Sequence, residues 1–224
     1  IPFSIETPEI YTNRNIFQVY QNTNDFNELS IQCFLERFKG YHTVVVDCND
    51  TTSRKGIFTF GLRRRMENMS RTYSITNLNS SETQFAKAFS STKPNVVILN
   101  TGRSPQLNVV FAKLNGLATV RPDLKISMFG YTEWLMYTKY ALDNFYKFDV
   151  YIPSAFFYNP LTSRTRRFET KYRWNFHQDM MQSLPRFAIT GFDHACWLLQ
   201  GLHMYGRNFQ GAAGSTGYTP TQTP

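Results

Sequence analysis

The sequence predicts an α/β fold in which a three-layer sandwich is built around a mostly parallel, doubly wound sheet. Five short apolar or β-branched runs alternate with segments of helical periodicity, which is typical of parallel strands joined by right-handed crossovers. The first run is continuously hydrophobic rather than alternating, which predicts a strand covered on both faces. With 42% hydrophobic residues and 20 phenylalanines, a chain of 224 residues can build the core that such a sheet needs.

The chain begins with a polar, irregular stretch over residues 1–15, which predicts an arm. Helical periodicity starts near residue 16, and we expect Asn24 or Asp25 to cap a helix that ends at Gly40. The apolar face of this helix is expected to contain Phe26, Leu29, Ile31, Cys33, Phe34, Leu35 and Phe38.

The first strand is expected over residues 43–48, before the polar loop 49–53, and the others at about 73–78, 96–100, 126–129 and 149–152. Helices are expected between them. The helix after Gly56 should turn four apolar side chains inward, namely Ile57, Phe60, Leu62 and Met66.

Serines are expected to open two of the later helices. Ser81 begins one of them, and Ser104 reads as an N-cap followed by Pro105 in a helix that ends at Gly116. A further helix is expected over residues 132–142.

The C-terminal part has a different character, because it is helical and rich in aromatic residues. Helices are expected over residues 166–181 and 191–205, and the second is expected to pack Ala195, Leu198, Leu199 and Leu202 against the body of the domain. The composition of 211–224 is that of a loop or linker. The domain organisation expected is an arm over 1–15, an α/β domain over 16–210 and a flexible linker over 211–224.

Composition makes several classes of protein improbable. No apolar run approaches the roughly 18 residues of a membrane span, so no transmembrane segment is expected, and residues 1–3 do not resemble the start of a signal peptide. Three cysteines allow at most one disulfide, and apolar neighbours favour buried thiols for Cys33, Cys48 and Cys196. The chain contains no Cys-x-x-Cys, His-Glu-x-x-His or dense His/Cys cluster, so we expect no metal and no cofactor.

The common catalytic motifs are missing as well. There is no Gly-x-Gly-x-x-Gly, no Walker-type phosphate loop and no Gly-x-Ser-x-Gly elbow, and no histidine is tied by spacing to a nucleophile. Asp47 and Asp50 lie near a strand end, where an acidic group could bind a metal or accept a phosphoryl group, although a loop or cap role is the simpler interpretation. The sequence therefore predicts a binding protein rather than an enzyme.

Ligands of open α/β sheets bind outside the carboxyl ends of the strands, which gives a candidate site. Three loops there combine small or polar side chains with a charge that could hold an ionic ligand. The expected contact residues are Asp50, Thr51, Ser53, Lys55, Thr101, Gly102, Arg103, Ser104, Tyr131 and Glu133. The alternative is that these are ordinary βα turns whose Ser and Thr side chains only cap helices.

The net charge of +8 lies largely in residues 63–65 and 164–173. A basic surface can attract nucleic acid, anionic lipid or acidic ligands, but a solvated helix face is the simpler interpretation of such short clusters. No nucleic-acid motif accompanies them, so we expect no nucleic-acid partner.

The segment from Thr190 to Phe209 resembles the Gly-aromatic-Asp, Ala-Leu and Tyr-Gly stretch near the end of type I periplasmic-binding-like proteins. It is similar above all to the Bacteroidetes members described as amino-acid ABC transporter substrate-binding-like proteins, which often carry a LysM peptidoglycan-binding domain. The strands and loops from Val44 to Ile152, with Phe129–Trp134, are similar to the second lobe of that fold. The resemblance spans roughly residues 15–210.

This resemblance implies a periplasmic or cell-envelope location and a small-molecule or peptidoglycan-derived ligand. It also implies a departure, because the opening βα units of a first lobe and a LysM domain are lacking here. The chain is therefore expected to be a C-terminal portion, with the missing first lobe of the same protein as its partner.

Three hypotheses for function follow. The chain is a ligand-binding or sensing lobe, an envelope scaffold that keeps the fold but has lost small-molecule binding, or a flavodoxin-like enzyme using Asp47 or Asp50. Ordered polar side chains at three adjacent strand ends would favour the first hypothesis. A strand-end cleft filled by aromatic rings would favour the second, and a carboxylate pair with a bound metal the third.

Overall fold

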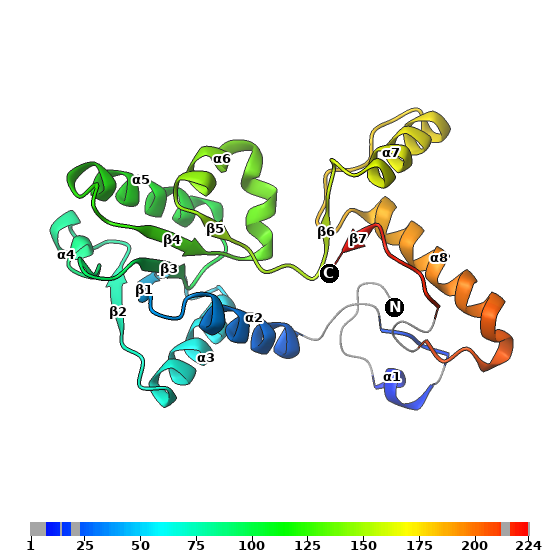
Figure 1. The fold of residues 1–224 in the computed structure, drawn as a ribbon, viewed down its shortest axis with the longest axis horizontal. Coiled ribbons are helices and arrows are strands. Elements are labelled where there is room, and N and C mark those ends of the chain that lie inside the picture. Colours follow the sequence, from blue (N-terminus) through cyan, green and yellow to red (C-terminus); the bar gives the residue numbers. More distant parts are fainter. Residues whose placement is uncertain (1–7, 14, 19–22, 212–215, 224) are drawn as a thin grey trace. The chain divides into compact units, whose positions relative to one another are not determined.

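The computed structural model of the chain describes residues 8–13, 15–18, 23–211 and 216–223 (Figure 1). The chain forms two compact units, which are described separately below. The sheet unit comprises Asn27–Pro153, and the helical unit comprises Ile1–Phe26 together with Ser154–Pro224. The expected α/β domain over 16–210 thus includes the whole sheet unit and part of the helical unit, and its predicted boundaries stay a prediction.

The sheet unit contains a sheet of five strands in the order β2-β1-β3-β4-β5, and every neighbouring pair is parallel. The strands are β1 (His42–Asp47), β2 (Tyr73–Asn77), β3 (Asn95–Leu99), β4 (Ile126–Phe129) and β5 (Val150–Tyr151). The predicted parallel sheet is confirmed, and each strand bound differs from the expected one by at most one residue.

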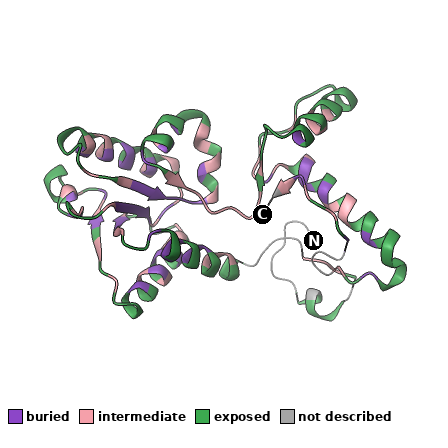
Figure 2. Cartoon of the chain, in the orientation of Figure 1, coloured by how far each residue is buried: buried purple, intermediate pink, exposed green. Residues whose placement is uncertain are grey.

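Helices cover both faces of this sheet, which makes the three layers. Figure 1 shows α2 (Thr23–Arg37) and α3 (Lys55–Asn68) on one face and α4 (Glu82–Ala86), α5 (Ser104–Val120) and α6 (Thr138–Lys147) on the other. Every residue of β3 is buried, as a central strand between two helical layers requires (Figure 2). The doubly wound arrangement predicted from the sequence is therefore present.

Aromatic rings fill the space between the sheet and its helices. Phe129 of β4 contacts Phe34 and Phe58 of the covering helices, with ring centroids 5.2 and 6.1 Å away. Trp134, at 0% exposure, lies in the 3-10 helix η1 (Thr132–Tyr137) that follows β4. A Cβ atom on Gly130 would clash with the ring of Trp134, so only glycine allows this tryptophan to fold back over the strand end.

Several helix faces differ from the expected ones. The buried stripe of α3 contains Phe58, Leu62 and Met66, whereas Ile57 and Phe60 are exposed, so their predicted inward orientation is wrong. The reason is the phase of the helix, because residues 58, 62 and 66 recur at intervals of four and set the stripe. On α2, likewise, Leu29 is exposed.

Two predicted caps are also displaced. The helix α2 begins at Thr23, so Asn24 and Asp25 lie inside its first turn and do not precede it. The helix α5 begins at Ser104 and has Arg103 at the cap position, with Pro105 in the first turn. The helix expected over 132–142 is η1 followed by α6.

All three cysteines are free, and Cys33 is exposed rather than buried, while Cys48 is buried and Cys196 partly buried.

The helical unit contains α1 (Glu9–Thr12), α7 (Ser163–Phe176), α8 (Phe187–Tyr205), η2 (Gly206–Asn208) and a small antiparallel pair, β6 (Phe157–Tyr158) with β7 (Gln222–Thr223). The helix α7 begins three residues before the expected range 166–181 and also ends earlier than expected. It ends there because His177 takes a left-handed conformation (φ 54) that terminates the helix. None of the helices in the described part of the chain is long and apolar enough to cross a membrane.

Within the helical unit, the face of α8 that was expected to be covered is not the buried one. Leu198, Leu199 and Leu202 are 37%, 65% and 47% exposed, and Ala195 is exposed too. The buried positions include Ile189, Asp193 and Gly201, which belong to a different stripe of the helix. Because α8 carries apolar residues around most of its circumference, its sequence does not specify which stripe is covered.

A buried carboxylate holds the C-terminal segment in the helical unit. Asp193 accepts hydrogen bonds from the hydroxyl of Tyr218 (2.8 Å) and from the main-chain N–H groups of Thr221 (2.8 Å) and Gln222 (2.9 Å). Composition had indicated a linker over 211–224. Residues 216–223 of that stretch are described and make these contacts, whereas 212–215 and 224 lie outside the described residues.

Candidate ligand site at the carboxyl edge of the sheet

The strand order places a topological switch point between β1 and β3. From β1 the chain continues to β2 on one side, and from β3 it continues to β4 on the other. In sheets of this kind the loops diverge at such a point and leave a crevice outside the carboxyl ends of the strands. The loops after β1, β3 and β4, residues 48–55, 100–104 and 130–133, are called the switch-point loops below, and they contain every residue of the predicted site.

Asp50 connects the first two of these loops. Its Oδ1 accepts hydrogen bonds from the N–H (3.1 Å) and hydroxyl (2.7 Å) of Thr52, and its Oδ2 accepts one from the Thr101 hydroxyl (2.7 Å). Arg103 Nε lies 3.4 Å from the same Oδ2, and the Asp50 side chain is only 4% exposed. The hydrogen bonds from Thr52 and Thr101, with the nearby Arg103 charge, lower the pKa of Asp50. Asp50 therefore organises the loops and does not face outward.

An ion pair brings the first and third loops together. Lys55 Nζ lies 2.7 Å from Glu133 Oε1, and the two side chains are 32% and 47% exposed. The same ammonium group lies 4.9 Å from the ring centroid of Tyr131. Gly102, from the second loop, is close to both partners, since a Cβ there would lie 3.6 Å from Lys55 Cε and 3.7 Å from the Glu133 carboxyl. Side chains from three adjacent strand ends thus meet at this edge.

Tyr131 forms the apolar floor beneath these polar groups. It is 5% exposed and donates a hydrogen bond to the carbonyl of Leu99. Its ring contacts Phe58 and Trp134, with centroids 5.9 and 6.0 Å away. Burial raises the pKa of Tyr131 well above its ordinary value, so the hydroxyl stays protonated. Tyr131 was expected to contact a ligand. Because it is buried, it instead lies beneath the Lys55 ammonium group and supports it.

The remaining hydroxyl groups act mainly within the turns. Ser53 Oγ accepts from the N–H of Lys55 (3.2 Å), and Thr101 Oγ1 accepts from the N–H of Arg103 (3.3 Å). These are the helix-capping and turn roles of the simpler alternative. Thr51 is exposed, and Ser104 is the first residue of α5. Among the predicted contact residues, the charged groups that remain accessible are Lys55, Glu133 and Arg103, the last 58% exposed.

An asparagine network was not predicted, although an asparagine lies at or just beyond the end of each of β1, β2 and β3. The Asn100 amide accepts from the N–H of Cys48 (2.8 Å) and donates to Asp47 Oδ1 (2.9 Å). The side chains of Asn49 and Asn77 exchange two hydrogen bonds of 2.9 and 2.8 Å. These asparagines therefore join neighbouring strand ends and hold the switch-point loops in place.

Cys48 does not present a reactive thiol here. Burial, reinforced by the charge of Asp47, raises the pKa of its thiol to about 12. The thiol is consequently protonated at neutral pH and behaves as a packed apolar group.

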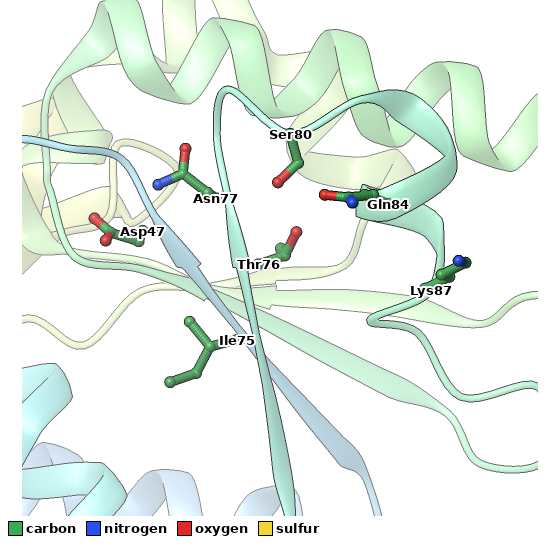
Figure 3. Close-up of a pocket in the computed structure, with 7 residues that line it drawn as sticks. All are labelled: Asp47, Ile75, Thr76, Asn77, Ser80, Gln84 and Lys87. Atoms are coloured by element: carbon green, nitrogen blue, oxygen red, sulfur yellow. The ribbon is translucent and has the colours of Figure 1, made fainter.

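A pocket of about 460 Å³ opens beside the outer strand β2. Figure 3 shows its lining residues, which are Asp47, Ile75, Thr76, Asn77, Ser80, Gln84 and Lys87. None of the predicted contact residues is among them. The pocket and the switch-point loops are therefore lined by different residues, and they are connected by the hydrogen bonds of Asp47 and of the Asn49–Asn77 pair.

The acidic residues at this edge are engaged by hydrogen-bond donors. Within the described residues, no group of three or more His, Cys, Asp or Glu side chains is arranged to hold a metal ion. Comparisons of the chain with protein-family models, curated proteins and solved structures give no significant match.

Proposed function

We propose that the sheet unit is the non-catalytic ligand-binding or sensing lobe of a periplasmic-binding-protein-like protein of the cell envelope, with its ligand at the switch-point loops. The observation that carries the proposal is the meeting of ordered polar side chains from three adjacent strand ends. A peptidoglycan-derived or other small polar ligand fits the resemblance described from the sequence.

The contact groups in this proposal are Arg103, Lys55 and Glu133. The Lys55–Glu133 pair is partly exposed, and exposed ion pairs contribute only about 0–1 kcal/mol, so a ligand can replace either partner at little cost. Since charges of both signs are available, the ligand should carry both an anionic and a cationic or hydrogen-bond-donating group. Asp50 and Thr101 hold the loops in the required arrangement.

The test uses the full-length protein purified from its host and begins with native mass spectrometry to identify a retained ligand. Titration calorimetry with that ligand should then show weaker binding for Arg103→Ala and for Glu133→Ala, with melting temperatures close to wild type. Arg121→Ala is the matched control, because it removes one partner of the exposed Arg121–Asp123 pair, away from the switch-point loops. Wild-type affinity in both site variants would contradict the proposal.

The envelope scaffold is the second candidate, and one observation favours it. The helix α8 exposes several large apolar side chains, among them Phe192 (41%), Leu199 (65%) and Met204 (53%), and exposed apolar surface of this kind is typical of interaction sites. Cosedimentation of the full-length protein with purified peptidoglycan would support this role if binding persists in Arg103→Ala and is lost when Leu199 is replaced by Glu. The flavodoxin-like enzyme has the least support, because the Asp50 carboxylate is already surrounded by donors.

A further inference from the structure

The outer strand β2 has an unpaired edge. One hydrogen bond shows which residues of β2 direct their main-chain N–H and C=O groups toward that edge. Leu78, just beyond β2, donates its N–H to the carbonyl of Asp47 on β1 (2.8 Å). Main-chain polar groups alternate in direction along a strand, so Ser74 and Thr76 also face β1, whereas Ile75 faces away from it. Since β2 ends the sheet, the N–H and C=O of Ile75 have no strand to pair with among the described residues.

The 460 Å³ pocket runs along this same edge. Its lining includes Ile75, Thr76 and Asn77, which are consecutive, so their side chains point alternately to opposite faces of the sheet. Figure 3 shows Asn77 on one side of the strand and Thr76 on the side of Gln84 and Lys87. The lining therefore includes residues of both faces and the edge residue Ile75, together with Asp47 of β1. The Ile75 side chain is 53% exposed there.

The charge of the pocket indicates what occupies it. Lys87 is exposed, and no ion pair or side-chain hydrogen bond of its own is found in the part of the chain that the structure describes. The other charged lining residue, Asp47, already accepts hydrogen bonds from Asn49 N–H and from Asn100. These neutral donors satisfy the Asp47 carboxylate but leave its negative charge, and Asp47 pairs with Asn77 on the face opposite Thr76. On the Thr76 face the charged lining residue is Lys87, which favours an acidic side chain of the partner there.

The same charge disfavours a second copy of this chain as the occupant. Antiparallel pairing of two β2 edges around Ile75 would continue the sheet and would keep both Lys87 side chains on the same face, close to the two-fold axis. Like charges in such a position repel each other. An acidic segment of a different protein does not meet this obstacle.

We propose that the open edge of β2 binds an extended acidic peptide segment of a partner protein as an added sixth strand. The main chain of the segment pairs with Ile75, which supplies affinity, and an acidic side chain on the face of Thr76 reaches Lys87, which supplies specificity. Apolar side chains on the other face of the segment cover Ile75. This site uses none of the residues in the proposed ligand site.

The probe is a short synthetic peptide, blocked at both ends, in which valine alternates with glutamate. Fluorescence anisotropy should show that the full chain binds it about tenfold more tightly than the same peptide with glutamine in place of glutamate, a difference that one charge-assisted hydrogen bond supplies. Lys87→Ala should remove this preference. Lys125→Ala, whose lysine directly precedes β4, is the matched control and should keep it.

Ile75→Pro tests the strand pairing itself. The Ile75 N–H points away from β1, so proline removes the donor offered to the peptide but no hydrogen bond of the sheet, and prolines are tolerated at such edge positions. Peptide binding should be lost while circular dichroism and melting temperature stay near wild type. If this variant fails to fold, methylation of alternate peptide nitrogens gives the same test on unchanged protein, because only one of the two alternating sets should abolish binding.

The outcomes separate the possibilities. Equal binding of the glutamate and glutamine peptides, or unchanged binding by Ile75→Pro, would overturn the proposal. So would a concentration-dependent dimer in sedimentation velocity that Ile75→Pro abolishes, since the occupant would then be a second copy. Arg103→Ala should bind the peptide like wild type, so this proposal and the proposed ligand site can fail independently.

Discussion

The two units of the chain hold themselves together by different means. In the sheet unit, β3 is wholly buried between two helical layers, and α5 buries Leu107, Val110 and Leu114 in the same apolar core. In the helical unit, α8 leaves Leu199 65% exposed and buries Asp193, whose carboxylate accepts hydrogen bonds from Tyr218, Thr221 and Gln222. Similar helical periodicity thus supports an apolar core in one unit and a buried, hydrogen-bonded carboxylate in the other.

The strongest contrast between the two units is expected for two leucines. Leu114→Ala, at a position that is 0% exposed, should reduce the free energy of unfolding by about 2–5 kcal/mol, because it leaves a cavity in the core of the sheet unit. Leu199→Ala should change it by less than about 0.5 kcal/mol, as exposed substitutions do. Urea denaturation measures both. Similar losses in the two variants would show that α8 is covered in solution and would remove the contrast.

A second prediction concerns the Asp193 clamp, which is the set of hydrogen bonds that Asp193 accepts from Tyr218, Thr221 and Gln222. Asp193→Ala leaves the buried donors of Thr221 and Gln222 without an acceptor, which should cost about 1–3 kcal/mol. Hydrogen exchange followed by mass spectrometry should show faster exchange in residues 216–223, while β1 and β3 keep their protection. Asp179→Ala, which removes an exposed partner of Arg173, is the control. Unchanged exchange in 216–223 would mean that the clamp does not hold the segment.

A smaller effect concerns pH in the sheet unit. The folded pKa of Asp50 is lowered, chiefly by the Thr52 and Thr101 hydroxyl groups, so its ionised form stabilises the fold above the unfolded pKa, which is about 3.9. This contribution should be lost as pH falls from about 4 through the lower folded pKa. The stability difference between wild type and Asp50→Asn should therefore be constant at neutral pH and shrink in acid. A difference that stayed constant down to the acid transition would contradict the assignment.

The smallest effect is that of the exposed ion pair. A double-mutant cycle on Lys55 and Glu133 should give a coupling energy of at most about 1 kcal/mol, and it should weaken as salt is added, because both side chains are accessible to solvent. Chemical denaturation at two salt concentrations measures it. A coupling of several kcal/mol would mean that the pair is a structural element and cannot open for a ligand.

The sheet could be predicted because its signal is local and redundant. A run such as Val44–Val46 is apolar at every position, and parallel pairing then places the carboxyl ends of all strands at one edge. This is why Asp50, Thr101 and Glu133, far apart in the sequence, were expected in one site. Their individual roles were not predictable, because the choice between holding a loop and facing outward depends on partners from other loops.

The orientation of α8 could not be predicted, because apolar residues surround most of that helix and the covered stripe depends on distant segments. Asp193 is an example, since its partners Tyr218 and Thr221 lie in a stretch whose composition indicated only a linker. The exposure of Cys33 was missed for a similar reason, because its apolar neighbours Ile31 and Phe34 point into the core while Cys33 does not.

The path of the chain through the two units has a consequence for synthesis on the ribosome. The sheet unit is an insertion, since the chain enters it after Phe26 and leaves it at Pro153, and the helical unit is assembled from segments on either side. Translation proceeds at about 5–20 residues per second, so on the order of seconds separate the emergence of the sheet unit from that of α8. During this interval the sheet unit can fold. The helical unit cannot be completed until its second segment, Ser154–Pro224, has been synthesised. A nascent chain stalled shortly after residue 153 has emerged should therefore already protect β1 and β3 from proteolysis.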